Sequence, residues 1–187
     1  MIYSWKKIVK TGLPLLTIAV FVEIFAGSIL QGKIDTLVGL TIFLISIPVI
    51  NSVGGNIGSV LGSRIASGLH VGYINASLKD KKMHENLITS VLIGISTYIF
   101  LSIVIYYIGT FGNVEMSIGF IEFVGIFLST GFFLICIVAF SSIIAAFISF
   151  KKGLDPDDMV APVVTTVGDV FGIVILFFMI SVFGVGI

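Results

Sequence analysis

Charged residues are scarce in this chain, at 11% of its 187 residues, whereas 57% are hydrophobic and the mean hydropathy is +1.21. A soluble domain has about twice that share of charged residues. The scarcity therefore excludes an ordinary soluble fold and indicates an integral membrane protein in a lipid bilayer. A spanning helix needs about 20 apolar residues, so this length accommodates five or six spans and leaves no room for a separate catalytic or regulatory domain.

Other residue types are also few, and their scarcity excludes further classes of protein. The single cysteine, Cys136, rules out a disulfide framework, and its apolar surroundings favour inert packing. His70 and His84 have no cysteine nearby, which favours a surface role over a zinc site. Ten acidic residues balance ten basic ones, so nothing indicates a nucleic-acid partner. No nucleophile–base pair or phosphate-binding loop is present, and we expect no enzyme.

The apolar runs predict an all-α bundle of five transmembrane helices in one domain, a multi-pass protein of the cell membrane. Pro14 and Glu23 interrupt the first run and argue against a cleaved signal peptide. The second and fourth runs exceed the required length, and we expect Pro48 and several glycines to break the second helix. The predicted spans cover residues 13–30, 37–66, 87–108, 118–150 and 159–183.

The basic residues predict the orientation of these helices. They gather before the first span, between the second and third, and between the fourth and fifth: Lys6, Lys7, Lys10, Lys79, Lys81, Lys82, Lys151 and Lys152. The other connections carry only Lys33, or Glu115 and no base. Cytoplasmic loops are enriched in Lys and Arg, so the amino terminus is predicted to be cytoplasmic and the carboxyl terminus external.

An acidic stripe follows the fifth predicted helix. Steps of four, three, four and three residues return to one helical face, which carries Asp158, Pro162, Thr165, Asp169 and Gly172. Asp169 lies well inside the hydrocarbon, where acids are costly and usually mark an ion or substrate path. The alternative is an acid neutralised by protonation or by a helix partner and retained for packing. Pro156 is suited to the first turn of this helix.

The second predicted helix carries a matching set of small and polar residues. Pro48, Ser52, Gly55, Asn56, Ser59 and Ser63 recur at helical spacing, and Asn51 adds a second amide. This pattern favours the lining of an ion path, more strongly for Asn56 than for Asn51. The alternative is close helix packing, because Gly54, Gly58 and Gly62 form a small-xxx-small series on the neighbouring face. Both interpretations can hold together.

These two segments resemble the membrane domain of the MgtE-type magnesium transporters and their eukaryotic solute-carrier relatives. The resemblance rests on Gly-Gly-Asn-x-Gly after a proline in an early span and on Asp-Pro-Asp-Asp-x-x-x-x-Pro-x-x-Thr-Thr-x-x-Asp-x-x-Gly in the last span. It extends to the order of the motifs, the five spans and their orientation. Leu61–Ser67 looks closer to the eukaryotic relatives, which carry two such repeats in one chain.

The resemblance implies a homodimer with a central cation pathway, in which Asp169 of each subunit contributes to a magnesium site. It also implies that Asn56 and the backbone from Ala161 to Thr166 shape that pathway. Bacterial members carry an acidic helical domain and a paired nucleotide-binding module before the membrane part. This chain has neither, so their magnesium-sensing gate is not expected here.

Ligand chemistry agrees with a divalent cation such as magnesium. Mg²⁺ prefers oxygen ligands in octahedral geometry and gives up water reluctantly, which suits a few carboxylates around a largely hydrated ion. Mn²⁺ or Co²⁺ would accept the same ligands.

Glu23 is a second intramembrane acid, with either a pathway role or a structural one. Three functions stay open: a magnesium channel or transporter, an antiporter coupled to Na⁺ or H⁺ through Glu23, and a non-transporting subunit that needs a partner.

Overall fold

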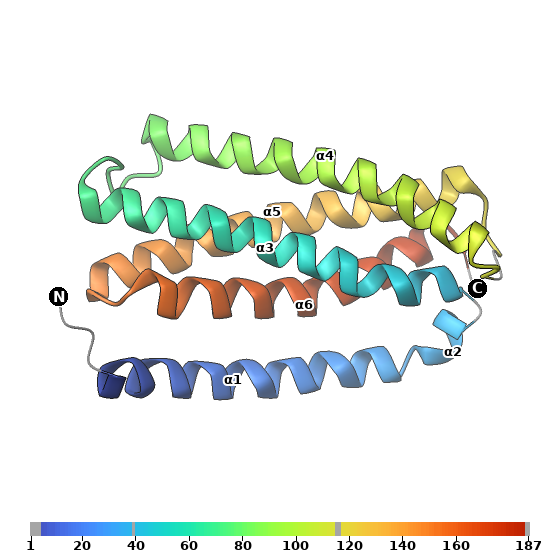
Figure 1. The fold of residues 1–187 in the computed structure, drawn as a ribbon, viewed down its shortest axis with the longest axis horizontal. Coiled ribbons are helices and arrows are strands. Elements are labelled where there is room, and N and C mark those ends of the chain that lie inside the picture. Colours follow the sequence, from blue (N-terminus) through green and yellow to red (C-terminus); the bar gives the residue numbers. More distant parts are fainter. Residues whose placement is uncertain (1–4, 39, 115–116, 186–187) are drawn as a thin grey trace.

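The computed structural model describes residues 5–38, 40–114 and 117–185, and all its regular elements are helices. Five of them are long and apolar enough to cross a membrane, which confirms the predicted number of spans. They lie roughly side by side along one axis (Figure 1). The helices are α1 (Trp5–Gln31), α2 (Ile34–Val38), α3 (Thr41–Val71), α4 (Lys81–Phe111), α5 (Phe120–Lys152) and α6 (Pro156–Val182).

Two features of the helices differ from the sequence prediction. The five-residue α2 was not predicted, because a single turn between two spans leaves no periodic signal. The second span was expected to break at Pro48 and its glycines, but α3 is continuous over 31 residues. That expectation was wrong because neighbouring helices pack against the glycines and hold the backbone helical. Pro162 likewise lies inside an unbroken α6, which begins at Pro156 as predicted.

The core of the bundle lies among α3, α4, α5 and α6. Glycines of α3 allow the close approach, since a Cβ on Gly58 or Gly62 would meet Val164 or Val160 of α6. Gly58 also faces Val138 and Ser142 of α5. The alternative interpretation of this glycine series, close helix packing, is therefore confirmed. Cys136 on α5 is exposed and lies outside this core.

α1 lies apart from this core. It packs along α6, which separates it from α3 in the bundle (Figure 1). Most of its large apolar side chains are exposed, and Phe21 and Phe25 show 68% and 65% of their surface. Ala26 is an exception at 3%. An apolar helix with so little protein cover is suited to a lipid environment or to a second subunit.

The charges separate along the bundle axis. One end of the bundle holds the amino-terminal turn of α1, the 72–80 loop and the α5–α6 turn (Figure 1). Nine of the ten basic residues lie toward this end, and Lys33 lies at the opposite end. Helix caps shape both ends: the Asp80 carboxylate accepts hydrogen bonds from the backbone N–H groups of Lys82 and Met83, and Glu122 accepts one from Gly119. Glu115, used in the orientation argument, lies outside the described residues.

Candidate functional site

The seam between α3 and α6 brings the two sequence motifs together. Gly55 of α3 and Gly168 of α6 meet backbone to backbone, since a Cβ on Gly168 would lie 3.3 Å from the Gly55 nitrogen. Thr165 packs against Gly55 on the same seam. The Thr165 hydroxyl lies 2.9 Å from the carbonyl oxygen of Ala161 and 3.2 Å from that of Pro162, so it donates back to its own helix. The motifs predicted to share a pathway are therefore neighbours in space.

Asn51 joins the two helices beside the intramembrane acid. Its Nδ2 donates a hydrogen bond to the backbone carbonyl of Asp169 at 3.2 Å, and the residue is 9% exposed. Its Oδ1 is packed against Gly172, where a Cβ would collide with it, and has no hydrogen-bond partner among the described residues. Asn51 and Gly172 were predicted to line the path or bind metal, and the structure places both in this interhelical contact.

The open face of α3 carries the other polar residues of its motif. Pro48, Ser52 and Asn56 are exposed, and the Asn56 amide donates to the Ser52 hydroxyl at 3.3 Å. Ser59 lies at the edge of this face, and its hydroxyl oxygen is buried without a partner among the described residues. A polar helix face toward lipid is costly, so these groups require water, an ion or another protein surface.

Asp169 lies between this seam and α1. Its side chain is partly buried, and α1 places the Glu23 carboxylate close enough for the two charges to interact. Thr166 of α6 is 8% exposed, and its hydroxyl lies 3.4 Å from Glu23 Oε1. Sequence reasoning identified each acid separately but not their proximity. Only the packing of α1 on α6 brings Glu23 to the helix of Asp169.

Asp158 and Pro162 lie on α6 toward its amino-terminal end, and both are partly buried. Pro162 has no N–H group, so the carbonyl of Asp158, four residues earlier, lacks its usual helical partner. Asp158 therefore provides a carboxylate and a backbone carbonyl oxygen without its helical hydrogen bond, on the stripe that contains Asp169. A helix rise of 1.5 Å per residue separates the two acids by about 16 Å. The described residues contain no group of three or more His, Cys, Asp or Glu side chains arranged to hold a metal.

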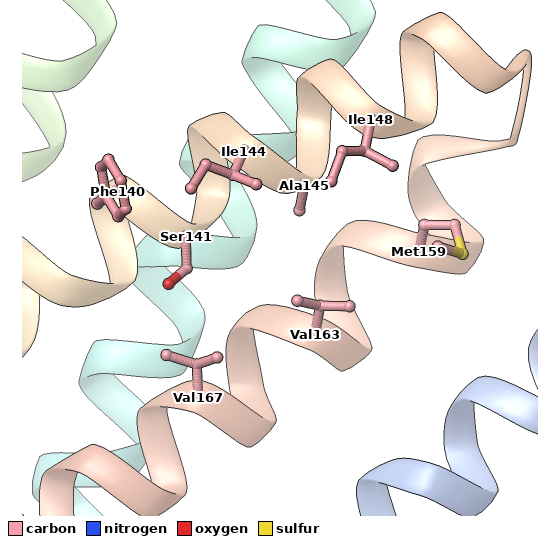
Figure 2. A pocket seen from close by; sticks show the side chains of 8 residues that line it. All are labelled: Phe140, Ser141, Ile144, Ala145, Ile148, Met159, Val163 and Val167. Carbon is pink, nitrogen blue, oxygen red and sulfur yellow. The ribbon is translucent and has the colours of Figure 1, made fainter.

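An apolar hollow on another face provides a contrast. It lies between α5 and α6, as Figure 2 shows. Its volume is about 220 Å³. Its lining comprises Phe140, Ser141, Ile144, Ala145, Ile148, Met159, Val163 and Val167. None of the candidate site residues borders it, and Ser141 supplies the only polar side chain in that lining. Its chemistry suits a lipid chain and not a hydrated cation.

Comparison with known families decides the assignment. The family model for MgtE, a divalent cation transporter, matches residues 47–179, from the second turn of α3 to near the end of α6. The chain belongs to the MgtE family. The comparison with curated proteins gave no match. Membership in the MgtE family identifies the protein as a multi-pass divalent cation transporter and confirms the resemblance drawn from the two motifs.

Proposed function

We propose that this MgtE-family protein is a Mg²⁺ channel or transporter that acts as a homodimer in the cell membrane, with its amino terminus cytoplasmic. The ion pathway lies at or near the dimer axis and is lined by α3 and α6. Mn²⁺ and Co²⁺ share the preference of Mg²⁺ for oxygen ligands and are further candidate cargo.

The observation that carries this proposal is the open polar face of α3 next to Asp169. Pro48, Ser52 and Asn56 are exposed along the first half of the membrane-spanning α3, with Asn56 at its midpoint, and no other element of the same chain covers them among the described residues. Polar groups at this depth occur where they face protein or a water-filled path. A second copy of the same face would enclose such a path between two subunits, as a two-fold interface requires.

Asp169 supplies the principal charge of the proposed site. One carboxylate from each subunit at the axis would neutralise a divalent ion that keeps most of its water. We assign Asp158, at the cytoplasmic mouth, to ion entry. Asn56, Thr165 and the Ala161 carbonyl are further oxygen ligands for the ion or its water. Gly55, Gly172, Ser59, Pro162 and Thr166 shape the pathway, and Asn51 positions α6 along it.

The test is Mg²⁺ flux into liposomes that contain the purified wild-type protein, Asp169→Ala or Asp169→Asn. Both variants are expected to lower flux by at least about 100-fold, corresponding to about 2.7 kcal/mol, while the dimer stays intact by size-exclusion chromatography. Wild-type flux retained in either variant would overturn the role of Asp169. A monomer in detergent and in crosslinking from membranes would overturn the dimeric pathway.

Glu23 favours a second candidate function, an antiporter that exchanges Mg²⁺ for Na⁺ or H⁺. Its carboxylate lies beside Thr166 and interacts with Asp169, so a second cation at Glu23 would compete electrostatically with Mg²⁺. The same liposomes, assayed with and without a Na⁺ or H⁺ gradient, separate the two functions. Flux that needs a gradient and is lost in Glu23→Gln identifies the exchanger. Silent, folded protein would favour a subunit that needs a partner.

A further inference from the structure

An open hollow with polar and apolar lining residues lies at the basic end of the bundle, away from Asp169. It occupies about 500 Å³ between the last turns of α3, the first turns of α4 and the loop that joins them. Arg64, Ser63 and Ser67 of α3 line one wall, and Asn86 of α4 and Tyr73 of the loop line another. Of these residues, only Ser63 belongs to the polar set of α3 described above, at the end of that set farthest from Pro48.

Backbone hydrogen bonds define the shape of the loop beside this hollow. α3 ends at Val71 and is capped by Gly72, whose φ of 76° is the left-handed conformation that glycine adopts readily. The N–H groups of Tyr73 and Ile74 both donate to the Gly68 carbonyl, at 2.8 and 3.0 Å, and the Ile74 side chain packs directly on Gly68. The chain therefore turns back tightly and places Tyr73 beside α3.

The charges around the hollow are predominantly positive. Arg64 is exposed and has no carboxylate partner among the described residues. Lys82 lies over the Tyr73 ring at 5.6 Å from its centroid and pairs with Glu85 at 2.9 Å. The Asp80 carboxylate is occupied by Asn75 and by the first N–H groups of α4. The nearby acids are thus already engaged, and the Arg64 guanidinium is left for an external anion.

From its position along α3, we expect the hollow to lie at the boundary between the hydrocarbon core and the lipid headgroups. α3 is about 46 Å long at 1.5 Å per residue, so it exceeds a hydrocarbon core of about 30 Å. With the midpoint of α3 at the bilayer centre, Arg64 lies about 12 Å from the centre, from where a long side chain reaches the headgroups. Val71 lines the hollow and shows 83% of its surface, and Leu78 of the adjoining loop shows 65%. These residues are suited to contact with acyl chains.

We propose that this hollow, here named the Arg64 groove, binds the phosphate of an anionic phospholipid headgroup at the cytoplasmic surface. The Arg64 guanidinium presents a planar fork that matches phosphate geometry and anchors the headgroup. Hydroxyl and amide groups of Ser67, Tyr73 and Asn86 surround it. Lys79 and Lys81 add attraction from the adjoining loop.

The test is a titration of the purified protein in detergent with phosphatidylglycerol or phosphatidylcholine, followed by native mass spectrometry. The wild type is expected to bind the first phosphatidylglycerol more tightly than phosphatidylcholine. Arg64→Gln removes the charged fork and is expected to weaken phosphatidylglycerol binding about tenfold. Lys33→Gln removes the same charge at the opposite end of the bundle and serves as the matched control, with binding unchanged.

Two further variants separate a defined groove from general surface charge. Arg64→Lys keeps the positive charge but lacks the planar guanidinium, so its affinity for phosphatidylglycerol is expected to lie between those of the wild type and Arg64→Gln. If Arg64→Gln does not fold, Arg64→Lys replaces it in the test. Ser67→Leu fills the hollow without changing charge and is expected to weaken binding as well. Equal losses in Arg64→Gln and Lys33→Gln would overturn the proposal. Displacement of the lipid by an equal concentration of soluble glycerol phosphate would assign the groove to a free anion and overturn the lipid assignment.

Discussion

The two faces of α3 differ in what they contact, although they alternate along one helix. Gly54, Gly58 and Gly62 are buried against α5 and α6, while Ser52 and Asn56 are exposed. The glycine face gains stability from close packing, and its residues carry no polar side chain. The polar face gains nothing from the fold of a single chain. This contrast teaches that the glycine face builds the bundle and that the polar face serves an interaction outside it.

The largest expected effect is on folding and comes from filling the glycine face. In Gly58→Leu the new side chain would collide with Val164, Val138 and Ser142, and overpacking of this kind costs about 3 kcal/mol or more. For a chain of this length we expect the melting temperature to fall by about 6–12 °C. Fluorescence-detected size-exclusion chromatography of heated detergent samples measures the shift.

Val60→Leu is the control for that variant, because Val60 is two residues away and 49% exposed. Its melting temperature is expected to stay within about 2 °C of the wild-type value. A Gly58→Leu protein as stable as Val60→Leu would show that α3 and α6 are not closely packed in the membrane.

The second effect is on transport and comes from the polar face. Asn56→Leu removes an amide that contacts only Ser52 of its own helix, so we expect an unchanged melting temperature. We expect Mg²⁺ flux in liposomes to fall about tenfold, as for the loss of one polar contact worth about 1.4 kcal/mol. Val60→Leu again serves as the control and should retain flux. Loss of stability without loss of flux would reverse the assignment of the two faces.

Helical periodicity predicted much of this arrangement. The positions of the five spans, the start of α6 at Pro156 and the separation of glycine and polar faces on α3 all follow from spacing and apolar length. The continuity of α3 did not follow, because isolated propensities treat Pro48 and a glycine series as breakers. In the bundle, α4, α5 and α6 pack against those glycines and supply the contacts that stabilise the helix.

The candidate site was less predictable than the fold. A helical wheel shows which residues share a face, but not which neighbouring helix covers that face. The spacing predicted Asn51 as a pathway residue, but it could not show that Asn51 lies buried against the Asp169 carbonyl and Gly172. The proximity of Glu23 to Thr166 depends on α1 packing along α6, and nothing in the sequence of either helix specifies that pairing.

A smaller effect is expected from one hydrogen bond on the packed side of α3. The Tyr98 hydroxyl of α4 donates to the Ile50 carbonyl at 2.8 Å, within the buried core. Tyr98→Phe removes this bond and little volume, so it should cost about 0.6–1 kcal/mol, or about 1–4 °C in melting temperature. Tyr107→Phe, at a residue that is 52% exposed, is the control and should leave stability unchanged. An equal shift in both variants would indicate that the hydroxyl contributes nothing specific.

The smallest effect is expected at the loop end of α4, outside the packed bundle. Hydrogen bonds from Asn75, together with those from the first turn of α4, hold the pKa of Asp80 below its ordinary value. A lowered pKa means that the carboxylate stabilises the fold above the ordinary pKa, and that this contribution is lost as the pH falls through the lower value in the folded protein. We therefore expect a small decrease in melting temperature from about pH 4 downwards.

Asp80→Asn keeps a side-chain cap but does not titrate, so its melting temperature should fall less over the same range. Parallel melting curves of the two proteins between neutral and acidic pH measure the difference, and identical curves would show that the Asp80 cap does not contribute to acid sensitivity.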